Sequence, residues 1–159
     1  MSWESDLTDD IINALQENGA LLAKINGKPT SIAKGINEDV FSETYRAQFP
    51  IIRFTWAGTD EENEPLDNLG PRFRTLTLNI HCGVYCPEDD ERFDVLSDLT
   101  EQVANALYDR EAKIGALLLD EINVSSIEVA PDVLMAPFGV AIMTVELTTW
   151  TERADRQGR

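Results

Sequence analysis

Apolar residues recur at helical spacing near the start of the chain. Over residues 6–18 the following apolar side chains fall on one helical face: Leu7, Ile11, Ile12 and Leu15. The sequence Asn18-Gly19 is typical of a helix C-terminus. We therefore predict an amphipathic helix here, followed by a further helical turn over Ala20–Ile25 and a chain reversal at Asn26–Pro29.

A second helical pattern begins at Pro87, a residue that suits the first turn of a helix. Acidic residues follow directly, where they favour the positive end of the helix dipole. The predicted apolar stripe consists of Phe93, Leu96, Leu99, Val103 and Leu107. This pattern predicts a long helix that packs across a sheet.

Alternating apolar and polar positions predict strands elsewhere in the chain. The alternation is clearest over Leu76–Val84, and it predicts a strand with one buried face within residues 72–85. Further strands are predicted over Thr30–Lys34, Ile51–Trp56, Ile122–Val129 and Gly139–Trp150. In the second of these the same face holds Ile52, Phe54 and Trp56, and in the last it holds Ala141, Met143, Val145 and Leu147.

The segments between these elements read as connections. Residues 37–48 have no sustained period, and Gly58–Gly70 is acidic and bounded by turn-forming residues. The order of helix, strands, helix and strands predicts an α+β fold, in which two main helices pack against a largely antiparallel sheet. We expect a single domain over residues 1–152 and a mobile tail over residues 153–159.

The net charge of the chain limits the kinds of molecule that it is expected to bind. Against 13 Lys and Arg residues the chain has 29 Asp and Glu residues, which gives a formal net charge of −16 over 159 residues. Such a charge disfavours binding to nucleic acid through a basic face and to anionic membranes. The start of the chain lacks the basic and apolar regions of a secretory signal, so we expect synthesis in the cytoplasm.

The usual signatures of catalysis and cofactor binding are missing. His81 and Cys82 fall on opposite faces of the predicted strand, and Cys86 is the only other cysteine, so a metal or redox site is disfavoured relative to two buried thiols. The run Gly27-Lys28-Pro29-Thr30 lacks the pattern of a phosphate-binding loop. We therefore expect a protein that is not an enzyme and has no cofactor or metal.

Several charged and aromatic residues remain as candidates for contacts with other molecules. The acidic group Asp60, Glu61, Glu62 and Glu64 suits a solvated loop better than a cation site, because its spacing does not match a calcium-binding loop. Trp3 precedes the first helix, where it would be able to pack on a neighbouring subunit. Arg153 and Arg156 oppose the acidic body, and Trp56 and Trp150 are predicted in the core or at its edge.

The whole arrangement resembles the tail terminator family of long-tailed bacteriophages and prophages, also called tail completion or minor tail protein U-like proteins. Its order and spacing carry the resemblance: the opening helix with residues 18–27, the strand start Phe49-Pro50-Ile51-Ile52, the strand Leu76–Tyr85 leading into the helix that ends at Tyr108, and the final strand Phe138–Trp150. The acidic connection Gly58–Gly70 and the leucine-rich segment at Leu117 depart from that pattern.

The resemblance implies a homo-oligomeric ring, commonly a hexamer, that caps the tail tube, ends its polymerisation and contacts the head connector. It places the protein in the tail–neck region of the virion, and in the host cytoplasm during assembly. DNA would pass through an acidic lumen without specific binding. The candidate interface residues are Trp3, Asp60, Glu61, Glu62, Glu64, Arg153 and Arg156.

Two other readings stay open. One is a different head–tail adaptor or a tail tube component, since such proteins also assemble into rings. The other is a small ligand-binding module or enzyme, in which His81 would be the titrating group and its loss would abolish activity.

Overall fold

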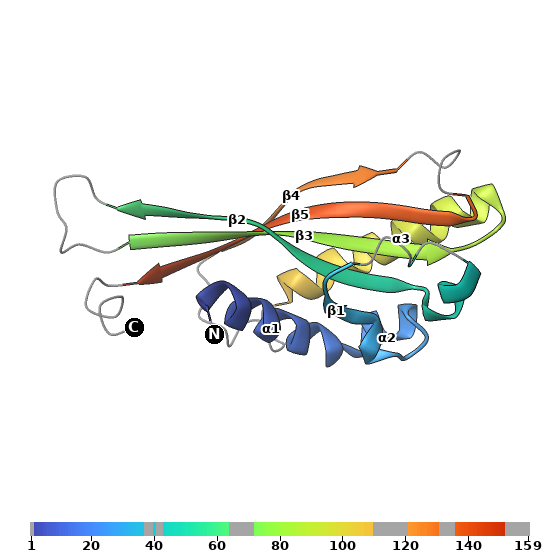
Figure 1. The fold of residues 1–159 in the computed structure, drawn as a ribbon, viewed down its shortest axis with the longest axis horizontal. Coiled ribbons are helices and arrows are strands. Elements are labelled where there is room, and N and C mark those ends of the chain that lie inside the picture. The colour runs from blue at the N-terminus through green and yellow to red at the C-terminus, as the bar shows by residue number, and fades with distance from the viewer. Residues whose placement is uncertain are drawn as a thin grey trace.

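A single five-stranded sheet forms the centre of the molecule (Figure 1). The computed structural model describes residues 2–36, 40, 43–63, 72–109, 121–130 and 136–151. In chain order the elements are α1 (Trp3–Gln16), α2 (Gly19–Lys24), the 3₁₀ turn η1 (Pro29–Ser31), β1 (Ile32–Lys34), the 3₁₀ turn η3 (Glu43–Gln48), β2 (Ile51–Asn63), β3 (Arg72–Tyr85), α3 (Asp89–Tyr108), β4 (Glu121–Val129) and β5 (Phe138–Thr151). The predicted α+β class is confirmed.

The strand order is β1-β2-β3-β5-β4, and only the β1–β2 pair is parallel. α1 and α3 pack on one face, where α3 contacts β3 and β5 and α1 contacts β1 and β2. This matches the expected pair of main helices on a largely antiparallel sheet.

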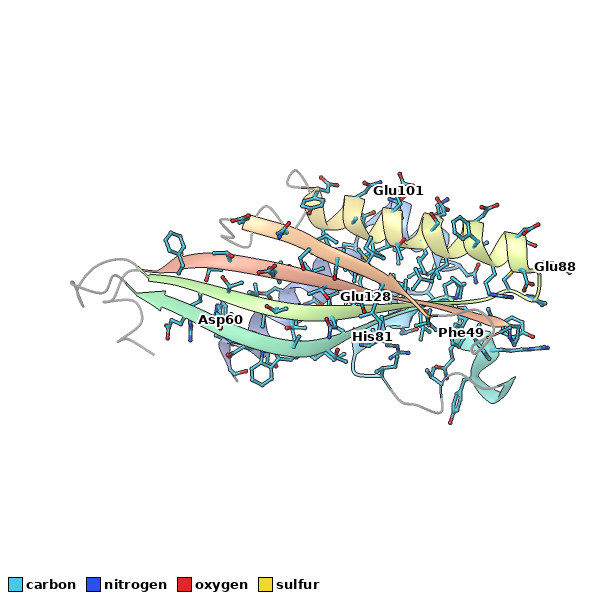
Figure 2. The ribbon with its side chains drawn as sticks, turned by 90° about the horizontal axis from the view of Figure 1, so that it is seen from above. Phe49, Asp60, His81, Glu88, Glu101 and Glu128 are labelled. Atoms are coloured by element: carbon cyan, nitrogen blue, oxygen red, sulfur yellow. The ribbon has the colours of Figure 1, made fainter. Side chains whose placement is uncertain are left out.

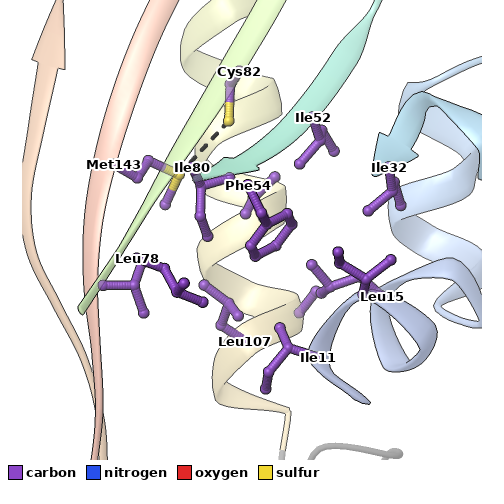
Figure 3. Close-up of a cluster of buried hydrophobic side chains, with 14 of the residues drawn as sticks. Ile11, Leu15, Ile32, Ile52, Phe54, Leu78, Ile80, Cys82, Leu107 and Met143 are labelled. Carbon is purple, nitrogen blue, oxygen red and sulfur yellow. Dashed lines mark hydrogen bonds between the residues drawn. The ribbon is translucent and has the colours of Figure 1, made fainter. Parts of the chain in front are cut away.

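The main core lies between the helices and the sheet, as the apolar periods predict. Leu15, Leu78 and Met143 are each 0–1% exposed, and they come from α1, β3 and β5 respectively (Figure 3). The Sγ atom of Cys82 lies 3.8 Å from the sulfur of Met143 within this cluster. Cys86 is also buried, and both cysteines are free thiols.

A second, smaller cluster covers one end of the opposite face of the sheet. It contains Val40, Phe49, Ile51 and Phe138. The ring centroids of Phe49 and Phe138 are 5.0 Å apart. The ring of Phe49 rests over Gly83, where a Cβ atom would come within 2.9 Å of Phe49 Cε2.

The prediction for the acidic connection was wrong over residues 58–63. Instead of ending at Trp56, β2 continues to Asn63, with a register shift between Trp56 and Gly58, and its last residues pair with the start of β3. Turn-forming residues and acidic charge favour a loop locally, but here the ladder with β3 supplies the backbone hydrogen bonds. Residues 64–70 of this connection lie outside the described part of the chain.

Trp56 was predicted to lie in the core or at its edge, but most of its side chain is exposed. It faces the same side as Phe54, yet it is 65% exposed. The reason is the length of β1, which pairs with β2 only from Ile52 to Phe54. Trp56 therefore stands beyond the end of its neighbouring strand, at the edge of the sheet.

The predicted stripe of α3 was wrong at its first position. Phe93 is 70% exposed, while Arg92 is only 1% exposed and takes the place expected for an apolar residue. Arg92 Nη1 donates a hydrogen bond to the carbonyl oxygen of Cys86 at 2.7 Å, and its Nη2 pairs with Asp89. The guanidinium is buried because it closes the turn between β3 and α3.

Smaller differences concern element ends. The first helix begins at Trp3, since the Ser2 hydroxyl accepts a hydrogen bond from the Ser5 amide. Asn18 does not end that helix but caps the start of α2 through the Leu21 amide. The predicted strand from Thr30 begins at Ile32, and part of the predicted loop forms η3.

Candidate functional site

Three strands extend beyond the N-terminal end of α1 and form a projecting arm (Figure 1). We define the arm as residues 60–63 of β2, 72–75 of β3 and 148–151 of β5, which the strand register places side by side. It carries three of the acidic residues that the sequence singled out. The arm is therefore a part of the sheet that α1 and α3 do not cover along its length.

α1 holds the base of the arm through an aromatic and an ionic contact. The guanidinium carbon of Arg74 lies 4.5 Å from the ring centroid of Trp3. Arg74 Nε lies 3.7 Å from Glu61 Oε1 across the β2–β3 pair. Two predicted interface residues, Trp3 and Glu61, are thus linked through Arg74 within one chain.

A hydrogen-bonded chain lies beside this contact. The Trp56 indole N–H donates to the Thr59 hydroxyl at 3.1 Å, and that hydroxyl donates to Glu4 Oε2 at 3.0 Å. Because Glu4 belongs to the first turn of α1, the chain connects the helix to the start of the arm. The base of the arm is therefore fixed relative to the body at two places.

The predicted acidic group is not gathered into one site. Asp60 is exposed and pairs in register with Thr75, which puts it on the sheet face away from α1 and α3. Glu61 lies on the opposite side, with Arg74. For Glu62 only the backbone, within β2, is described, while Glu64, Arg153, Arg156 and the predicted tail lie outside the described residues.

Both long edges of the sheet have open stretches within the described residues. β4 is paired only with β5, and its side chains Ile127 and Val129 are 47% and 60% exposed. On the other side, β2 has no outer partner strand beyond Phe54. Open edges of this kind are able to pair with another chain.

The face of the sheet opposite the helices is polar along its middle. Thr55 Oγ1 and His81 Nε2 lie 3.1 Å apart, and Thr144 donates to the side-chain oxygen of Asn79 at 3.2 Å. Partial burial lowers the pKa of His81. Figure 2 shows His81 on the sheet between Asp60 and Phe49, which lie toward opposite ends.

A reactive thiol, a metal site and a membrane-spanning helix each need particular side chains in particular surroundings. Burial raises the pKa of Cys82 to about 12, so its thiol is protonated and enclosed in the core. Among the described residues no group of three or more His, Cys, Asp or Glu side chains is arranged to hold a metal ion. No helix in that part of the chain has the length and apolar composition needed to cross a membrane.

Sequence reasoning missed a basic cavity at the other end of the sheet. Arg53 projects from β2 between two hollows of about 170 and 390 Å³, and Gln48 lines both of them. Lys28 borders the larger hollow. The sequence gives one weak indication of this cavity, which is Arg53 itself, a charged residue in the mostly apolar segment Ile51–Trp56.

In comparisons with models of protein families and with characterised proteins, the chain matches none.

Proposed function

We propose that this protein is a non-enzymatic structural component of tail-terminator type, which assembles into a closed ring and caps a phage tail tube. The observation that carries the proposal is the three-stranded arm, which extends beyond the helices at one end of the sheet. An ordered arm of this kind provides a surface for a neighbouring subunit or for the tube. Its contacts with α1 hold it in a defined direction.

The two open edges of the sheet support assembly into a ring. They lie on different strands, β2 and β4, so contact between one edge and the other would be heterologous. A heterologous contact closes into a ring when the rotation between successive copies divides a full turn evenly. The net charge of −16 suits a channel through which DNA slides without binding.

Mass in solution tests the assembly. Light scattering over a range of protein and salt concentrations is expected to reveal a closed ring near a hexamer. Open-ended tubes would instead identify a tail tube component. A monomer at every concentration, also in the presence of purified tail tubes, would contradict the proposed function.

Tube capping tests the terminator role itself. Added to growing tail tubes, the protein is expected to bind at one end and stop elongation. Reversing the acidic residues of the arm, with Asp60→Lys, Glu61→Lys and Glu62→Lys, is expected to reduce capping. Glu101→Lys, at an exposed position on α3, is the matched control and should cap normally.

A further inference from the structure

Among the described residues, none accepts a hydrogen bond from the partly buried guanidinium of Arg53. Its side chain stands on the sheet face opposite the main core, and its Nε atom is shielded from solvent without a hydrogen bond. Within the described part of the chain it forms neither an ion pair nor another hydrogen bond. Desolvation lowers the pKa of Arg53 for the same reason. Partial withdrawal of a cation from water without a counter-charge is unfavourable, so an acceptor at this position would stabilise the guanidinium.

The two hollows beside Arg53 are bordered by hydrogen-bond donors. The larger has Lys28 and Thr30 at its border, and the smaller has Tyr45. Lys28 Nζ donates to the carbonyl oxygen of Ala47 at 3.2 Å, which leaves further N–H groups of the ammonium available. None of the described residues that line either hollow is a carboxylate. The described lining therefore offers two cations and several hydrogen-bond donors, which are groups that bind a carboxylate.

A carboxylate of the required kind is exposed at the far end of the same sheet face. Asp60 pairs with Thr75, and Arg53 pairs with His81. Thr75 and His81 both lie on the polar face of β3, opposite the main core. Asp60 therefore faces the same side as Arg53, with the register shift of β2 between them. Figure 1 shows the arm at one end of the molecule and β1 and α2 toward the other. Within one chain the two groups are too far apart along β2 to meet, so a contact between them needs a second copy of the chain.

We infer that the cavity at Arg53 binds a carboxylate from the arm of a neighbouring copy, supplied by Asp60. The inference rests on the proposed ring and adds a specific contact between its subunits, beside the contact between the open edges of β2 and β4. Electrostatic complementarity supports it, because the chain has a net charge of −16 and this cavity collects two of its few cations. The contact is heterologous, and successive copies related by rotation close into a ring.

Charge reversal at each partner tests the contact. Arg53→Glu and Asp60→Lys are each expected to weaken association by about tenfold or more, measured as the concentration at which the ring mass is lost in sedimentation. Combining both changes in one chain restores opposite charges across the interface and is expected to recover the ring. Arg53→Met removes the charge but keeps an unbranched side chain. It should also weaken association, but it does not add the repulsion that Arg53→Glu creates with Asp60.

Mixing the single variants gives a sharper result. The Arg53→Glu protein keeps an intact arm, and the Asp60→Lys protein keeps an intact cavity. In the mixture every contact between unlike copies joins opposite charges, either Asp60 with Arg53 or the introduced lysine with the introduced glutamate. A ring of alternating copies is therefore expected, while each variant alone associates more weakly than the wild type. Glu101→Lys changes an exposed charge elsewhere and serves as the matched control. Circular dichroism establishes that every variant is folded.

Three results would overturn the inference. If the wild type forms rings that neither Arg53→Met nor Asp60→Lys affects, the ring stands and this contact is wrong. If succinate shifts the Arg53 Nε–H resonance in NMR spectra while the arm variants assemble normally, the cavity takes a small carboxylate and not the arm. If the wild type remains monomeric at all concentrations, the ring and the contact both fail.

Discussion

The guanidinium carbon of Arg74 lies 4.5 Å from the centroid of the Trp3 ring, so a residue at the start of α1 covers the base of the arm. Arg74 is only 19% exposed at its side chain, and its second contact is with Glu61. An arginine held between an indole and a carboxylate has little freedom left. The amino-terminal tryptophan, expected at a subunit interface, thus has a role within its own chain.

A double-mutant cycle measures this contact. Trp3→Leu and Arg74→Met are each expected to lower the free energy of unfolding in urea, and the double variant should lose less than the sum. The expected coupling is about 0.5–1 kcal/mol, typical of a cation–π pair of this exposure. Strict additivity would show that the two side chains do not stabilise each other.

Arg92 should matter far more for stability than its acidic partner. Arg92→Met leaves the Cys86 carbonyl oxygen without its donor at 2.7 Å, and a loss of about 1.5–3 kcal/mol is expected. Asp89 is 81% exposed at its side chain, so Asp89→Asn should cost about 0.5 kcal/mol or less. Thermal and urea unfolding of both variants provide the comparison. Equal losses would mean that the ion pair, and not the carbonyl contact, stabilises the turn.

Gly83 is expected to tolerate no side chain. A Cβ atom there would lie 2.9 Å from Phe49 Cε2 and 3.0 Å from Ile51 Cγ1, so Gly83→Ala overpacks the second cluster. A destabilisation of about 1–3 kcal/mol is expected in urea unfolding. Adding Phe49→Leu should recover part of the lost stability, because the smaller side chain leaves room for the new Cβ atom.

Gly19→Ala is the matched control for Gly83→Ala. A Cβ atom at Gly19 meets nothing within 4 Å, and alanine favours the helical conformation. This variant should be as stable as the wild type or slightly more so. If Gly83→Ala is equally harmless, Phe49 does not pack against the sheet as described.

His81 makes stability depend on pH near neutrality. Burial lowers its pKa below the ordinary value of 6.5, so the unfolded chain takes up a proton at a higher pH than the folded protein does. Stability should therefore fall as the pH drops through 6.5 and level off below the folded-state pKa. His81→Gln should remove this part of the decline, measured as the difference between the two urea-unfolding profiles between about pH 7.5 and 5. Identical profiles would contradict the burial of the ring.

The apolar periods determined most of the fold. The alternation over Leu76–Val84 identifies both a strand and its buried face, because successive side chains in a strand point to opposite sides. The same reasoning located β4, β5 and the two main helices. The exact ends of the helices and strands, and the contacts of the candidate site, were harder to predict from the sequence. Trp3, Glu61 and Asp60 were singled out, but nothing local indicated that Arg74 joins the first two or that Asp60 faces the other way.

The sequence by itself determined which segments are helices or strands and which of their faces are apolar, because these properties depend on spacing within one segment. Tertiary structure decided the exceptions. Trp56 is exposed since β1 ends before reaching it, and Arg92 is buried since a carbonyl oxygen in the adjoining turn needs a donor. Arg53 became a candidate site because the chain folds donors around it and, among the described lining residues, supplies no carboxylate. These three features depend on how segments far apart in the sequence pack together, so the local pattern of the sequence does not predict them.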